Sequence, residues 1–90
     1  MRSVEGYFIE RGDSTMEAKK LIQLTAPEEV QEFVTLASGC DFDIDMRYNK
    51  VIVDAKSFLG VLSLLSHPVM IFSQGSNEAF DAMLEKYAVA

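Results

Sequence analysis

Residues 49–64 read NKVIVDAKSFLGVLSL and contain a turn, a short strand and the beginning of a helix. Val51 and Val53 are two positions apart, which is the period of a strand. Apolar side chains then recur at helical spacing, at Phe58, Val61, Leu62 and Leu65. Ser57 stands directly before them, where an N-cap residue is expected. The stretch therefore predicts a strand followed at once by a helix that runs from Ser57 to about Leu65.

The other strands are predicted on both sides of this stretch, at 21–25, 41–46 and 69–73. Polar and apolar residues alternate strictly from Asp41 to Met46, which is typical of a strand with one solvated face. The turn at 48–50 joins this strand to 51–53, so we expect the two strands to form a hairpin.

Two further helices are predicted. The first follows the strand at 21–25, because Thr25 and Glu28 have the spacing of a capping box and Pro27 fits the first helical turn. Its apolar stripe consists of Val30, Phe33, Val34 and Ala37, and Gly39 ends it. The last helix follows the turn at 74–76 and has its stripe at Phe80, Met83, Leu84 and Tyr87.

The predicted order of elements is β-α-β-β-α-β-α, an order that ferredoxin-like folds share in part. It predicts an α+β fold with a four-stranded, mostly antiparallel sheet and three helices on one face. Residues 1–15 differ from the rest in being Gly- and Ser-containing and mixed in charge. We therefore predict an N-terminal extension at 1–15 and one domain at 16–90. The extension is expected to add a strand through Val4–Ile9 or to pack on a neighbouring chain.

Composition narrows the class of protein. With 49% hydrophobic and 24% charged residues the chain has a globular composition. The net charge of −6 argues against binding of nucleic acid and of anionic membrane surfaces, because both draw affinity from Lys and Arg. The single cysteine, Cys40, allows no intramolecular disulfide and is expected to be a small buried apolar residue. No apolar run approaches the ~18 residues of a membrane span, and the first residues lack a secretory signal, so we expect a cytoplasmic protein.

The segment at 49–64 resembles the regulatory-serine segment of the HPr family, the phosphocarriers of the bacterial sugar phosphotransferase system. The resemblance extends from about Leu21 to Tyr87 and implies an HPr-like open-faced β-sandwich. In that family a histidine before the first helix carries a phosphoryl group, within a Gly-Leu-His-Ala-Arg-Pro-Ala pattern. Residues 25–30 of this chain read TAPEEV, so the proline is present as Pro27 while the glycine, histidine and arginine are missing.

The missing histidine loop predicts that phosphocarrier activity is lost. Glu28 and Glu29 lie at the helix start, where their carboxylates satisfy the helix dipole and repel a phosphate. The only histidine, His67, lies in the turn before Pro68 and is expected to be a surface or half-buried turn residue. No catalytic triad or zinc ligand set is visible in the sequence, so we expect neither an enzyme nor a protein that needs a cofactor.

The acidic residues Asp41, Asp43 and Asp45 have the spacing of the first ligands in a calcium-binding loop. An EF-hand loop that begins at residue 41 needs glycine at 46 and glutamate at 52, but the chain has Met46 and Ile52. We therefore interpret the run as the solvated face of a strand and predict no metal site.

Ser57 matches the serine that a dedicated ATP-dependent kinase phosphorylates in HPr of some bacteria, after which the modified form binds a transcriptional regulator. The resemblance places an apolar docking patch beside it, at Lys56, Phe58, Leu59 and Leu62. The alternative is that Ser57 is only a helix cap and that Phe58 and Leu62 are only core residues.

The sequence thus predicts an HPr-like protein without phosphohistidine carrier activity that acts as a regulatory or docking partner in carbohydrate-linked signalling and is switched at Ser57. The expected partner is a protein, either an HPr-kinase-like enzyme or a transcriptional regulator. The alternative function is a structural interaction module that forms a homodimer through the N-terminal extension or a sheet edge.

Overall fold

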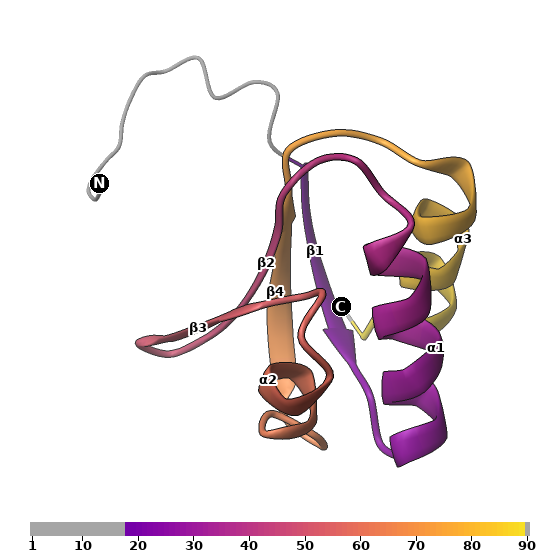
Figure 1. The fold of residues 1–90 in the computed structure, drawn as a ribbon. Helices are drawn as coiled ribbons and strands as arrows, with labels where there is room; N and C mark the ends of the chain where they lie inside the picture. The colour runs from indigo at the N-terminus through magenta and orange to yellow at the C-terminus, as the bar shows by residue number, and fades with distance from the viewer. Residues whose placement is uncertain (1–17, 90) are drawn as a thin grey trace.

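Seven elements follow one another in the order that the sequence predicts (Figure 1). The structure is a computed structural model and describes residues 18–89. The elements are β1 (Ala18–Gln23), α1 (Pro27–Ser38), β2 (Ile44–Tyr48), β3 (Val51–Asp54), α2 (Phe58–Leu62), β4 (Pro68–Ser73) and α3 (Glu78–Tyr87). The proposed extension at 1–15 and its strand at Val4–Ile9 lie outside the described residues.

The four strands form a single sheet in the order β1-β4-β2-β3, and all three pairings are antiparallel. β1 and β3 are therefore the edge strands. The helices lie on one face of the sheet and leave the other face open, as Figure 1 shows. This arrangement confirms the predicted α+β open-faced sandwich.

The core lies between the sheet and the helices. Side chains two positions apart on the strands point toward the helices, among them Ile22, Ile44, Met46, Val69 and Ile71. The predicted stripes of the helices face them, and the rings of Phe33 on α1 and Phe80 on α3 lie 5.6 Å apart. Within the described residues, no helix is long and apolar enough to cross a membrane.

The second helix is shorter than predicted. α2 ends at Leu62 instead of about Leu65, because the chain tightens there into i→i+3 turns. The amide of Leu64 bonds to the carbonyl of Val61 (3.0 Å), and that of Leu65 bonds to the carbonyl of Leu62 (3.1 Å). Ser66 then adopts a φ of 72°, which ends the helical path before Pro68.

The alternating run at 41–46 is only partly a strand, since β2 begins at Ile44. Phe42 leaves the sheet and covers the turn between β4 and α3, where a Cβ on Gly75 would lie 2.6 Å from the Phe42 ring. The backbone returns to the sheet through the Asp43 carbonyl, which accepts the amide of Gln74 at 3.0 Å. Alternation therefore predicted the strand but not the packing of its first residues.

Candidate functional site

The start of α1 is the place where the HPr resemblance puts phosphoryl chemistry. Its N-cap is Ala26, which has no side-chain cap, and Pro27 is the first helical residue. The carboxylate of Glu29 accepts the Thr25 amide at 2.8 Å and lies 3.4 Å from the Thr25 hydroxyl. The predicted capping box of Thr25 with Glu28 is therefore wrong by one position, because Pro27 at N1 makes Glu29 the third residue of the helix.

Three backbone amides at this helix start are already engaged. The amides of Glu29 and Val30 both donate to the Ala26 carbonyl, at 3.0 and 3.2 Å. Pro27 has no N–H, and the Thr25 amide is bound by the Glu29 carboxylate. An anion site at a helix start needs several free N–H groups and a positive field. Here those three amides have partners, and Glu28 and Glu29 bring negative charge.

His67 lies closer to this region than the sequence suggests. The adjacent Ser66 donates its amide to the Leu24 carbonyl at 2.7 Å, and the Gln23 side chain donates to the Ser66 carbonyl at 3.0 Å. The turn before β4 is thus tied to the end of β1, just before α1. The His67 ring is exposed and stacks on Tyr48 at a centroid distance of 4.5 Å. Its placement agrees with the predicted surface turn residue.

Ser57 caps α2 as predicted. Its backbone is extended (φ −98°, ψ 114°), and its hydroxyl accepts the Gly60 amide at 3.1 Å. The preceding turn is closed by Asp54, whose carboxylate accepts the Lys56 amide at 2.9 Å and whose carbonyl accepts the Ser57 amide at 2.9 Å. The Ser57 side chain is exposed.

The four residues of the predicted docking patch differ in their solvent exposure. Leu59 is 76% exposed and Phe58 is 36% exposed, so both present apolar surface beside Ser57. Leu62 is half-buried and packs against the core. The Lys56 ammonium donates to the Cys40 carbonyl at 2.9 Å, which ties the start of α2 to the segment after α1. We use the name α2 patch for Phe58 and Leu59 together.

The three aspartates of the acidic run do not share one strand face. Asp41 and Asp43 are exposed and lie outside β2, while Asp45 lies on β2 and pairs with Arg47 at 3.5 Å. In the part of the chain that the structure describes, no three His, Cys, Asp or Glu side chains come together as metal ligands would.

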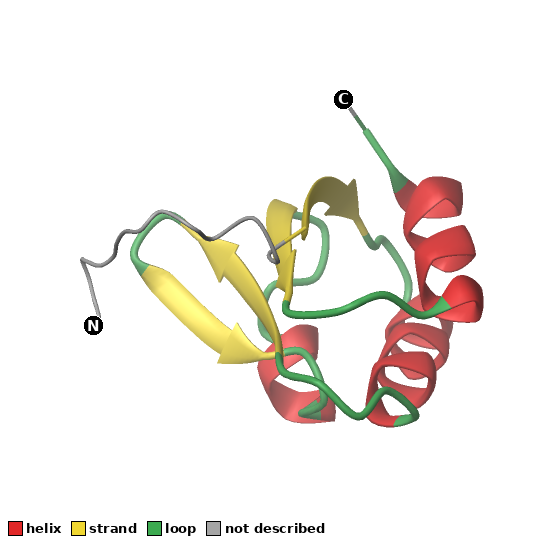
Figure 2. Cartoon of the chain, turned by 90° about the horizontal axis from the view of Figure 1, so that it is seen from above, coloured by secondary structure: helices red, strands yellow, loops and turns green. Residues whose placement is uncertain are grey.

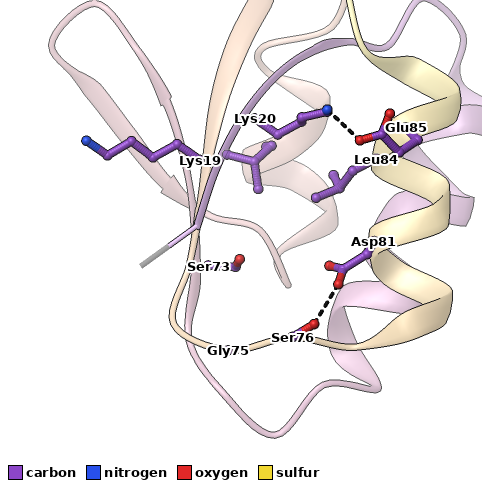
Figure 3. A pocket seen from close by; sticks show the side chains of 9 residues that line it. Lys19, Lys20, Ser73, Gly75, Ser76, Asp81, Leu84 and Glu85 are labelled. Atoms are coloured by element: carbon purple, nitrogen blue, oxygen red, sulfur yellow. Dashed lines mark hydrogen bonds and ion pairs between the residues drawn. The ribbon is translucent and has the colours of Figure 1, made fainter. Parts of the chain in front are cut away.

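A hollow of about 320 Å³ lies between the β1–β4 edge and α3 (Figure 3). Polar side chains form two pairs along its wall: Lys20 with Glu85 at 2.5 Å, and the Ser76 hydroxyl with the Asp81 carboxylate at 2.7 Å. None of the candidate site residues from the sequence lines it. We assign the candidate site to the α1 start and the α2 patch for this reason.

No protein-family model matches the chain, and no curated protein matches it. Among solved structures, the chain is similar to the phosphocarrier protein HPr from Bacillus anthracis str. Ames, with a TM-score of 0.62, 25% identity, and coverage of 79% of this chain and 96% of that chain. It is also similar in fold to HPr-C-His from Thermoanaerobacter tengcongensis, with a TM-score of 0.60, 23% identity, and coverage of 78% and 86%. Both likenesses confirm the predicted HPr-like fold.

Proposed function

We propose that this HPr-like protein is a non-enzymatic docking domain of carbohydrate-linked regulation that carries no phosphoryl group on histidine. The observation that supports the proposal most is the Glu29 carboxylate, which sits 2.8 Å from the Thr25 amide at the start of α1. A carrier of this fold needs an imidazole there, together with free amides and a cation for the incoming phosphate. The chain instead supplies two carboxylates, and the amides of Thr25, Glu29 and Val30 are already bonded.

The loss of carrier activity is tested by phosphotransfer. The chain is incubated with phosphoenolpyruvate and the first enzyme of the phosphotransferase system, and its intact mass is measured under alkaline conditions. We expect no added phosphoryl group, while an HPr with a complete histidine loop gains one in the same mixture. A gain that disappears in His67→Ala would contradict the proposal, because it would make His67 an acceptor.

The docking surface is the α2 patch. Leu59 and Phe58 expose apolar area on the first turn of a helix, next to the exposed Ser57. A phosphate on Ser57 retains an oxygen for the Gly60 amide and adds about −2 charge next to this apolar surface. Modification therefore changes what the patch can bind and leaves the capping interaction in place.

Modification at Ser57 is tested with an HPr-kinase-like serine kinase and ATP. We expect a gain of one phosphoryl group in the intact protein and none in Ser57→Ala. Ser63→Ala is the matched control, since Ser63 is an exposed serine at the end of the same helix and its hydroxyl bonds to the Gly60 carbonyl. The Ser57 part of the proposal fails when the wild-type chain gains no mass.

Docking is tested by titrating the phosphorylated chain into a transcriptional regulator of catabolite control. Leu59→Ala should weaken binding at least about fivefold, because it removes the most exposed side chain of the patch. Val89→Ala removes a comparable exposed apolar side chain near the C-terminal end and should leave the affinity unchanged. Equal losses in both variants would place the contact elsewhere.

A further inference from the structure

Among the described residues, no strand covers the outer edge of β3, which carries exposed apolar side chains. In the part of the chain that the structure describes, β3 pairs with β2 alone, and Figure 2 shows it as the outermost strand, on the side of the hairpin away from α1 and α3. Ile52 is 59% exposed and Val51 is 45% exposed. Together with the α2 patch they account for four of the five large hydrophobic side chains that are exposed among the described residues. Such an edge pairs readily with another strand unless charges or bulges protect it.

The hydrogen-bond pattern shows which backbone groups face this edge. The Ala55 amide donates to the Ile44 carbonyl at 3.0 Å, in line with the β2–β3 register. Backbone groups in an antiparallel pair alternate in direction along each strand. Val51 and Val53 therefore direct their N–H and C=O groups to β2, as Ala55 does. Ile52 directs both groups outward and Asp54 directs its N–H outward, while the Asp54 carbonyl accepts the Ser57 amide at 2.9 Å.

This alternation restricts how a second copy can pair with β3 around a two-fold axis. An axis at Ile52 sets Ile52 against Ile52, Val51 against Val53, and Lys50 against Asp54 of the second copy. An axis at residue 51 instead sets Lys50 against Ile52, an axis at 53 sets Ile52 against Asp54, and an axis at 54 sets two aspartates face to face. Only the first arrangement matches apolar with apolar and places both charges opposite their complement.

The two charged residues are available for this pairing. Within the described residues, neither Lys50 nor Asp54 has an ion-pair partner, and both are exposed. One Asp54 oxygen accepts the Lys56 amide at 2.9 Å, which holds the carboxylate at the end of the strand. The second oxygen remains for a lysine of another chain.

We propose that two copies of this chain associate through antiparallel pairing of their β3 edges, centred on Ile52 and flanked by two Lys50–Asp54 ion pairs. The two four-stranded sheets then join into one continuous sheet. The interface involves short strands, so the association is weak and depends on concentration. It uses a surface different from the α2 patch and is independent of the proposed docking function.

The full chain is tested by sedimentation equilibrium up to millimolar concentration. We expect a reversible monomer–dimer equilibrium that Ile52→Asp abolishes. Leu59→Asp is the matched control, because it introduces the same charge at a more exposed apolar position outside the pairing strand, and it should leave the equilibrium unchanged. A wild-type chain that stays monomeric at every concentration overturns the proposal, as does equal loss in both variants.

The register is tested by reversing the charges. Lys50→Glu and Asp54→Lys each place like charges opposite one another and should weaken self-association roughly fivefold to thirtyfold. Mixing the two variants should restore association, since each then offers the charge that the other lacks. Thermal unfolding of Asp54→Lys verifies that the loss of the Lys56 contact has not unfolded it. A mixture that associates no better than its components refutes the Ile52-centred register.

Discussion

Tyr87 and Glu32 are 55 residues apart in the sequence, yet the Tyr87 hydroxyl donates a 2.6 Å hydrogen bond to a Glu32 carboxylate oxygen. Lys86 donates to both oxygens of the same carboxylate, at 3.1 and 2.8 Å. Glu32 on α1 thus receives three donations from the last two residues of α3. Beyond them, the Val89 amide bonds to the Leu21 carbonyl on β1 at 3.2 Å. The segment from Lys86 to Val89 is therefore bonded to both α1 and β1.

This cluster predicts a change of stability in acid. Hydrogen bonds from Lys86 and then Tyr87 lower the pKa of Glu32 below its ordinary value of 4.5. The carboxylate therefore stabilises the fold above the pKa of the unfolded chain, and this contribution is lost as the pH falls through the lower folded-state pKa. Glu32→Gln should melt about 2–5 °C lower than wild type at pH 7, and the difference should shrink toward pH 3.

The control for this measurement is Asp43→Asn, which neutralises an exposed carboxylate. It should leave both the melting temperature and its pH dependence close to wild type. A Glu32→Gln variant whose difference from wild type is the same at pH 3 and pH 7 would show that the carboxylate charge does not carry the effect.

Gly75 is predicted to tolerate no side chain. A Cβ at this position would lie 2.6 Å from one atom of the Phe42 ring and 2.8 Å from another, so the ring would have to move. Gly75→Ala should destabilise the fold by about 1–3 kcal/mol in urea unfolding. Gly39→Ala is the control, because its Cβ would meet only ordinary contacts beyond 3.4 Å.

A double variant tests whether the loss of stability in Gly75→Ala comes from the Phe42 ring or from the backbone at position 75. When Phe42→Ala is combined with Gly75→Ala, the methyl group no longer meets the ring, so the alanine at 75 should cost little in this background. Additive losses in the double variant would rule out the Phe42 contact as the origin.

The capping role of Ser57 gives a further prediction. Ser57→Ala removes the acceptor of the Gly60 amide and should cost about 1 kcal/mol in urea unfolding. Ser57→Asp keeps an acceptor at the N-cap and should lie close to wild type. Identical stability of wild type, Ser57→Ala and Ser57→Asp would show that the cap does not stabilise the fold. Capping would then not account for the serine at this position.

The fold could be predicted from the sequence because its signals are local. Apolar spacing identified every helix and strand that the structure describes, and Ser57 marked the start of α2 directly. The two boundaries that differ most in function-bearing segments have different causes, one a contact between distant residues and the other a local turn. Phe42 leaves its strand to cover Gly75, and the end of α2 is set by the tight turns that lead into Ser66.

The candidate site could be predicted only in part. The carboxylates at the start of α1 were visible in the sequence, but which of them binds the backbone depends on Pro27 occupying the first helical position. The tie of Lys56 to the Cys40 carbonyl joins residues 16 apart and has no sequence signal. The same is true of the turn that brings His67 next to the end of β1, because a backbone contact such as that of Ser66 with Leu24 does not depend on side-chain identity.

Cys40 should react with thiol reagents only when the fold opens. Its side chain is 5% exposed, its sulfur lies 3.5 Å from the Leu36 carbonyl, and burial raises the pKa of the thiol. Both effects lower the concentration of accessible thiolate. With an aromatic disulfide reagent at pH 8, the native protein should react at least about 100-fold more slowly than the same protein in denaturant.

A Cys40→Ala variant that carries Ser38→Cys is the control, because position 38 is exposed near the end of α1 and should react fast in both states. Native Cys40 reacting as fast as that exposed thiol would mean that α1 and the segment after it open without global unfolding.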